Sequence, residues 1–123
     1  MLDYFHRNFP DVPTVQASIC DCDASDYSVD AVLAWGVMFH LTPEQQHRAI
    51  ANVATALKPG GLFLFTSGDV DGGKEGEPMN GVPFHYYSFA EDGYRRLLAA
   101  NGLELESMHK DRGQNCYYLA RRL

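Results

Sequence analysis

Cysteine and histidine are the side chains in this chain that most readily bind a metal ion. The chain has three cysteines and five histidines, and one residue separates Cys20 from Cys22. This spacing matches no usual zinc pattern, and Cys116 is remote in the sequence. Ser67 does not lie within the Gly-x-Ser-x-Gly motif of hydrolases. We therefore expect neither a metal site nor a serine nucleophile.

Two acidic segments do not fit the patterns of known ion-binding loops. In Asp21–Asp26 and the residues after it, the EF-hand pattern fails, because Asp26 stands where glycine is needed and Val32 where the last glutamate is needed. The glycine-rich segment Ser67–Val82 is also acidic, and no helix follows its glycines directly, so it does not resemble a phosphate-binding loop. We expect Ser67–Val82 to be a long loop.

The composition is that of one ordinary globular domain spanning residues 1–123. Hydrophobic residues make up 46% and charged residues 21% of the chain. The net charge of -6 argues against nucleic acid and anionic membranes as partners. The longest apolar run is too short to cross a bilayer, and the N-terminus lacks the apolar region of a signal peptide. Three cysteines with no evident pairing favour a reduced, cytoplasmic compartment.

Two apolar segments are predicted as strands with a helix between them. Ala31–Phe39 is continuously apolar, which is typical of a strand covered on both faces. Thr42–Gln45 has the pattern of a capping box with proline at the first helical position, and Lys58–Gly61 ends the helix. Leu62–Thr66 is the second strand, so the unit predicts a parallel crossover. A shorter strand is expected earlier, over Thr14–Cys20.

The C-terminal part is predicted to form a helix and a hairpin. We expect Ser88 to cap the helix with Glu91 as its partner, and Tyr94 to belong to the apolar stripe of that helix. The alternation in Leu103–Ser107 indicates a half-exposed strand, and Cys116–Leu119 is expected to return beside it in the antiparallel direction.

The segment VDAVLAWGVMFHLTPEQQHRAIANVATALKPGGLFLFTS, residues 29–67, resembles the class I S-adenosylmethionine-dependent methyltransferases. Their pattern is an aspartate-led apolar strand, a His-Leu-Thr/Ser-Pro turn into a helix, Leu-Lys-Pro-Gly-Gly and another apolar strand. The resemblance implies an α/β fold of the Rossmann-like three-layer αβα type, with a mostly parallel sheet that ends in an antiparallel hairpin. It also implies S-adenosylmethionine as cofactor and methyl transfer to a small-molecule or other acceptor.

The resemblance also implies cofactor-binding residues. Asp21 and Cys22 stand where the family binds adenine, while Ala34, Trp35 and Gly36 end the strand that lies beside the methionine moiety. Open α/β sheets bind ligands at the carboxyl ends of their strands, which supports the second group independently. The alternatives are that Asp21 belongs to a solvated loop that caps nearby backbone groups, and that Trp35 is simply a core residue.

Two residues are candidates for the acceptor side of the site. The resemblance places His40 towards the reaction centre, as a base or as a polar contact for the acceptor; the alternative is an ordinary histidine near a helix N-terminus. Tyr87 follows the glycine-rich segment and is a candidate for a lid or an acceptor pocket, with a packing anchor as the alternative. Methyl transfer is an in-line displacement that depends strongly on positioning, so no base is obligatory.

The opening strand, Gly-x-Gly loop and ribose-binding acid of the family have no counterpart in this sequence. We therefore expect the chain to begin part-way through the family domain, with the first strands missing. The strand Asp30–Trp35 would then have an unpaired edge, which favours a homodimer or strand exchange. The alternative function is a non-catalytic module that acts in dimerisation or in complementing a separate partner.

Overall fold

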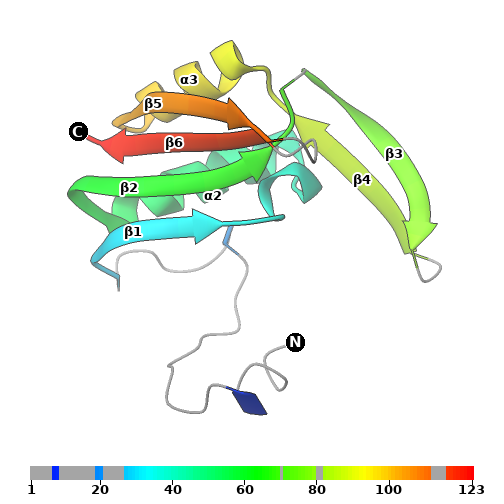
Figure 1. Ribbon diagram of the computed structural model, residues 1–123, viewed down its shortest axis with the longest axis horizontal. Coiled ribbons are helices and arrows are strands. Elements are labelled where there is room, and N and C mark those ends of the chain that lie inside the picture. Colours follow the sequence, from blue (N-terminus) through cyan, green and yellow to red (C-terminus); the bar gives the residue numbers. More distant parts are fainter. Residues whose placement is uncertain (1–6, 9–18, 21–26, 70, 80–81, 112–115) are drawn as a thin grey trace.

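The computed structural model describes residues 7–8, 19–20, 27–69, 71–79, 82–111 and 116–123. Its main sheet has four strands in the order β1-β2-β6-β5, and a separate two-stranded sheet pairs β3 with β4 (Figure 1). The main sheet comprises β1 (Val29–Ala34), β2 (Leu57–Ser67), β5 (Leu103–Lys110) and β6 (Cys116–Arg122). The remaining elements are η2 (Met38–His40), α2 (Pro43–Ala56), β3 (Gly72–Met79), β4 (Val82–Ser88) and α3 (Glu91–Ala100).

The strand directions confirm the predicted crossover and hairpin. β1 and β2 are parallel and are connected through η2 and α2, whereas β6 pairs antiparallel with both β2 and β5. The expected α/β fold class is confirmed. In the described part of the chain, α2 and α3 pack on the same face of the sheet, so two of the three expected layers are seen there (Figure 1).

The core lies between that face and the two helices. Alternate residues of the central strands are fully buried there, including Phe63, Phe65, Tyr118 and Ala120. The rings of Phe63 and Phe65 stack with centroids 4.7 Å apart, and those of Phe65 and Tyr118 with centroids 5.0 Å apart. These contacts fix the register of β2 against β6, because a slip of one residue would turn every ring to the opposite face.

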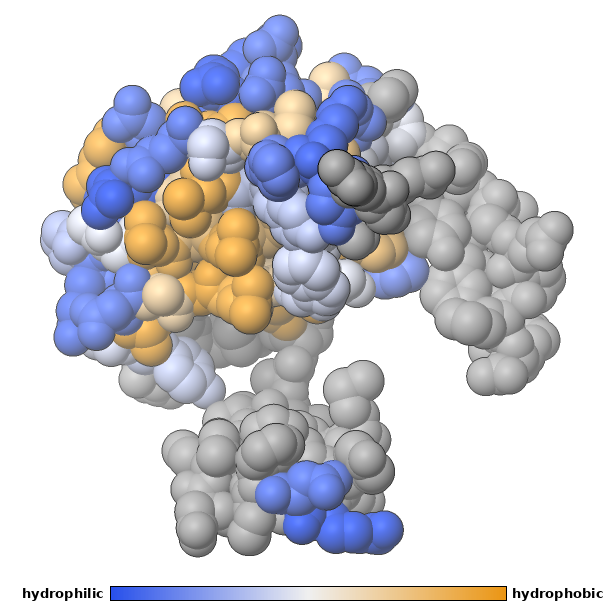
Figure 2. All heavy atoms as spheres, viewed as in Figure 1, coloured by the Kyte–Doolittle hydropathy of each residue, from blue (hydrophilic) through white to orange (hydrophobic). Residues whose placement is uncertain are grey.

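The opposite face of the sheet is apolar as well. Leu33 on β1 keeps 65% of its surface exposed, and Leu64 and Leu119 are its neighbours across β2 and β6. Figure 2 shows this face as a continuous hydrophobic area. The expectation that the first strand is covered on both faces is therefore not met by the described residues.

The helix α2 begins as its sequence predicts. The Thr42 hydroxyl accepts a hydrogen bond from the Gln45 amide at 3.2 Å, and the Gln45 side chain accepts one from the Thr42 amide at 3.0 Å. Pro43 occupies the first turn, where its missing N–H costs nothing. The helix ends at Ala56, and the predicted stop signal Lys58–Gly61 already belongs to the extended chain of β2.

Two predicted strands have different limits in the structure. β1 stops at Ala34, at the strand end expected at Ala34–Gly36. The rest of the apolar run Ala31–Phe39 leaves the sheet, because the backbone turns at Gly36, where φ is 72°, and then enters η2. Of the strand expected over Thr14–Cys20, only Ile19 and Cys20 are described, and they form a turn.

The segment expected as a long loop, Ser67–Val82, instead contains β3, the first strand of the β3–β4 hairpin (Figure 1). The predicted cap of the following helix is also wrong. α3 has Ala90 at its N-cap position, with no side-chain cap of its own, and the Ala90 amide donates to the Asp71 carboxylate at 2.9 Å. The Asp71 carboxylate thus accepts from the N-cap amide, the role expected of Glu91 in the capping box, while no side chain fills the role expected of Ser88.

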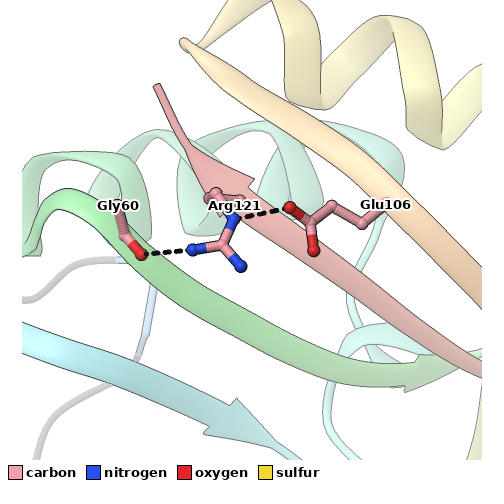
Figure 3. A network of polar contacts seen from close by, with 3 residues as sticks. All are labelled: Gly60, Glu106 and Arg121. Atoms are coloured by element: carbon pink, nitrogen blue, oxygen red, sulfur yellow. Dashed lines mark hydrogen bonds and ion pairs between the residues drawn. The ribbon is translucent and has the colours of Figure 1, made fainter.

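At the sheet end away from the carboxyl ends of β1 and β2, Arg121 connects three strands (Figure 3). Its guanidinium donates to the Glu106 carboxylate at 2.5 Å and to the Gly60 carbonyl at 3.1 Å. Because the pair is partly exposed, its contribution to stability is small. None of the candidate site residues that the structure describes lies at this end of the sheet.

Candidate functional site

The carboxyl ends of the parallel strands β1 and β2 meet at one edge of the sheet. Ala34 is the register partner of Phe65 there, and it is almost completely buried. The Gly36 amide donates to the Thr66 hydroxyl at 2.8 Å, which holds the chain leaving β1 against the end of β2. A crevice at such strand ends is the usual ligand site of an open α/β sheet.

Trp35 and Gly36 face open space at this edge. Trp35 is 53% exposed, so it is not the core residue that the alternative interpretation assumed. Its ring packs on Tyr117 of β6 with centroids 5.1 Å apart. Gly36 adopts a left-handed conformation, and a Cβ built on it would meet no atom within 4 Å. The strand end therefore offers an exposed ring beside unfilled volume.

The two acceptor-side candidates lie on neighbouring elements. His40 is exposed at the end of η2, with its ring centroid 4.4 Å from that of Phe39. Tyr87 lies near the end of β4, which packs against η2. The Tyr87 ring makes an edge contact with Phe89, and its carbonyl accepts a hydrogen bond from Gln46. Tyr87 thus has contacts of the packing kind that the alternative interpretation expected.

The proposed adenine-binding residues, Asp21 and Cys22, lie outside the described residues. Of the two residues just before them, Ile19 is held against α2 and Cys20 is buried. The Asn52 side-chain amide donates to the Ile19 carbonyl at 2.8 Å. This contact holds Ile19 at the helix that follows β1.

A buried polar cluster beside these elements was missed by the sequence analysis. Gln46 of α2 is fully buried, and its side-chain oxygen accepts from the Tyr94 hydroxyl at 2.7 Å. The Ser67 and Tyr94 hydroxyls lie 2.5 Å apart. Tyr94 was assigned to the apolar stripe of α3, which describes its ring but not its hydroxyl. The available signal was a glutamine on the same helix face as Ala49, Ile50 and Val53.

Electrostatics distinguish the interior of this region from its rim. Burial raises the pKa of Tyr94 to about 12, although its hydrogen bonds with Ser67 and Gln46 oppose that shift. Burial also raises the pKa of Tyr118, whose hydroxyl donates to the Gly68 carbonyl at 2.6 Å. Both phenols are therefore neutral donors at physiological pH. Near Gly68, the partly exposed Asp69 carboxylate pairs with Lys110 of β5, and the hydrogen bond between them lowers the pKa of Asp69.

Within the described ranges, no group of three or more histidine, cysteine, aspartate or glutamate side chains is arranged to hold a metal ion. No helix in that part of the chain is both long and apolar enough to cross a membrane.

The fold and the strand-end site define the chain as a Rossmann-like α/β domain. A family model described as a methyltransferase domain matches residues 1–61. No curated protein matches the chain significantly. Together with the fold, this match shows that the chain belongs to the class I S-adenosylmethionine-dependent methyltransferase family.

Solved structures share the fold at low sequence identity. The CcbJ methyltransferase from Streptomyces caelestis is 16% identical, with a TM-score of 0.78, and the match covers 100% of this chain and 75% of that one. A 1,6-didemethyltoxoflavin-N1-methyltransferase from Burkholderia thailandensis is 18% identical, with a TM-score of 0.71 and coverage of 98% and 56%. The glycopeptide N-methyltransferase MtfA is 15% identical, with a TM-score of 0.73, and the match covers 99% of this chain and 69% of that one.

The chain is shorter than several of the structures that it matches. It spans 56%, 65% and 34% of the length of three of them.

The raised pKa of Tyr94 predicts a loss of stability at alkaline pH. The folded protein holds the phenol proton up to about pH 12, whereas the unfolded chain releases it near the ordinary tyrosine pKa of 10.0. The contribution of the protonated Tyr94 to the free energy of unfolding is therefore complete below pH 10. It is lost as the pH rises towards 12, at about 1 kcal/mol per pH unit. Urea unfolding at pH 9, 10 and 11 should show a steeper decline for the wild type than for Tyr94→Phe.

Tyr27→Phe is the matched control, because Tyr27 is 40% exposed. Its decline between pH 9 and 11 should equal that of the wild type. Parallel declines for Tyr94→Phe and the wild type would contradict the prediction.

Proposed function

We propose that this chain forms the cofactor and acceptor site of a methyltransferase that acts on a small molecule. The observation that carries the proposal is the end of β1, where Gly36 leaves open volume and is tied to Thr66, and where Trp35 exposes its ring. A small-molecule acceptor is supported by the Burkholderia relative, whose structure holds 1,6-didemethyltoxoflavin and S-adenosylhomocysteine.

The residues at the strand end fit the methionine part of S-adenosylmethionine. The left-handed Gly36 lets the backbone come close to a ligand without a side chain in between. Ala34 supplies a small, buried floor, and Trp35 supplies an apolar wall. Asp21 and Cys22 are proposed to hold the adenine, through the carboxylate and a backbone amide. They follow Ile19, whose carbonyl accepts from Asn52 of α2, and the buried Cys20.

When bound, S-adenosylmethionine supplies a methyl group on a positively charged sulfur, and the acceptor atom attacks the methyl carbon as its bond to sulfur breaks. The protein's task is to align the two molecules and exclude water, which accounts for much of the rate in such displacements. We assign Tyr87 to the acceptor wall. His40 is proposed as a polar contact that can take the proton released by the acceptor.

The first test is binding of S-adenosylhomocysteine, followed by calorimetry and by tryptophan fluorescence. Trp35 is the only tryptophan of the chain, so a change in emission reports on the strand end itself. We expect micromolar affinity and an emission change. Asp21→Asn should weaken binding by about tenfold to a hundredfold, the cost of losing a hydrogen bond to a charged group.

Asp23→Asn is the control, since it removes the same charge from the same acidic segment. Its affinity should stay within about threefold of the wild type. Absence of binding at millimolar ligand would mean that this chain has no cofactor site, and an equal loss in both variants would refute the role of Asp21.

A second test uses two glycines with the same backbone geometry. Gly36 and Gly60 both have positive φ, 72° and 82°, and at both a Cβ would meet nothing within 4 Å. Replacing either by alanine should cost about 1 kcal/mol of unfolding free energy, since alanine resists this conformation. Only Gly36→Ala should also weaken S-adenosylhomocysteine binding, by about tenfold, because only its methyl group would enter the site.

Unfolding in urea measures the first effect and calorimetry the second. If Gly36→Ala loses as much unfolding free energy as Gly60→Ala but binds S-adenosylhomocysteine as tightly as the wild type, the ligand does not approach this strand end.

A second candidate function is a non-catalytic assembly module, with a second copy of this chain as partner. In the part of the chain that the structure describes, three of the four exposed large apolar residues, Tyr27, Leu33 and Trp35, lie in or next to β1. Among the described residues no strand pairs with the outer edge of β1. An edge strand with apolar side chains is a ready template for pairing with another chain.

Light scattering on the purified chain tests this candidate. We expect a mass of two chains for the wild type and of one chain for Leu33→Lys. Leu123→Lys is the control, because Leu123 is 71% exposed at the C-terminal end and should leave the mass unchanged. A wild-type mass equal to one chain would exclude assembly through β1.

A further inference from the structure

Gln46 stands out because it is a fully buried glutamine on the core face of α2. Burying an amide side chain costs free energy unless its donors and acceptor find partners. Here the side-chain nitrogen donates to the Leu41 carbonyl at 3.2 Å and to the Tyr87 carbonyl at 2.9 Å, while the oxygen accepts from Tyr94. Both amide hydrogens and the oxygen are therefore used.

The two carbonyls belong to the two elements that carry the acceptor-side candidates. Leu41 is the C-cap of η2 and directly follows His40. Tyr87 lies on β4, forty-one positions along the chain from Gln46. A single nitrogen thus joins the turn after β1 to the base of the β3–β4 hairpin. Only a group with two hydrogens on one atom can serve both carbonyls, and glutamine supplies it without a charge.

The oxygen of Gln46 ties this bridge to the sheet. Tyr94 donates to it and also contacts Ser67, the last residue of β2. The edge contacts of Phe89 with the Tyr87 and Tyr94 rings, with centroids 5.2 Å and 5.3 Å apart, fill the space between them. The base of the β3–β4 hairpin is therefore held in a fixed position relative to the end of β2, beside the proposed site.

We propose that Gln46 is a positioning residue that sets the β3–β4 hairpin as a wall of the acceptor pocket. Its two donated hydrogen bonds hold His40 and Tyr87 in one fixed relation, and the cofactor side of the site does not depend on them. The role of this wall in binding the acceptor rests on the proposed function. The bridge itself can be tested without any methyl transfer.

The experiment is hydrogen exchange on the wild type, Gln46→Met and Tyr94→Phe, read by mass spectrometry over Val82–Ser88 and Met38–His40. Gln46→Met keeps the side-chain length but removes both donors. Tyr94→Phe disturbs the same buried cluster and leaves the two donated bonds in place. We expect exchange in both segments to rise about tenfold or more in Gln46→Met and to stay within about threefold of the wild type in Tyr94→Phe.

Equal exchange in the two variants, or unchanged exchange in Gln46→Met, would overturn the proposal. If Gln46→Met does not fold, Gln46→Asn replaces it, because the shorter amide cannot reach both carbonyls. Calorimetry with S-adenosylhomocysteine separates this inference from the proposed function. Its affinity should be the same in Gln46→Met and the wild type, and a loss in that variant alone would overturn the assignment to the acceptor side.

Discussion

The packing around Phe65 is the constraint on which the rest of the structure depends. This fully buried ring contacts Phe63, Tyr94 and Tyr118, and so joins β2 to α3 and β6 at one point. Burying each such side chain contributes about 2 to 3 kcal/mol, and aromatic pairs add to this. Because Phe65 is also the register partner of Ala34, the same packing fixes where β1 ends, and hence where the chain turns at Gly36.

Polar groups enter this core only where the strands end. Ser67, the hydroxyl of Tyr94 and the amide of Gln46 form one satisfied cluster, and the described residues contain no buried side-chain polar atom without a partner. Unpaired, such groups would destabilise the fold, but joined they hold a unique arrangement. The strand-end edge is therefore rigid on its core side, while Trp35 and His40 lie exposed on its outer side.

The predictability of each element followed the range of the interactions that form it. The start of α2 depends on Thr42 and Gln45, three residues apart, and its capping box was predicted correctly. The cap of α3 depends on Asp71, nineteen residues away, so the local pattern pointed to the wrong residue, Ser88. The β3–β4 hairpin was missed for a similar reason, since glycines and acidic residues suggest a loop until the pairing of two strands is known.

The candidate site was predictable in position but not in its contacts. Strand order alone places Ala34, Trp35 and Gly36 at the carboxyl edge of the sheet. No sequence pattern indicates that Trp35 packs on Tyr117 or that Gln46 donates to the Tyr87 carbonyl of β4, because these two contacts join residues from opposite halves of the chain. The apolar run of β1 suggested burial on both faces, yet Leu33 and Trp35 are exposed. Hydrophobicity predicts that a surface will be covered, whereas the cover itself is supplied by another element, a ligand or a second chain.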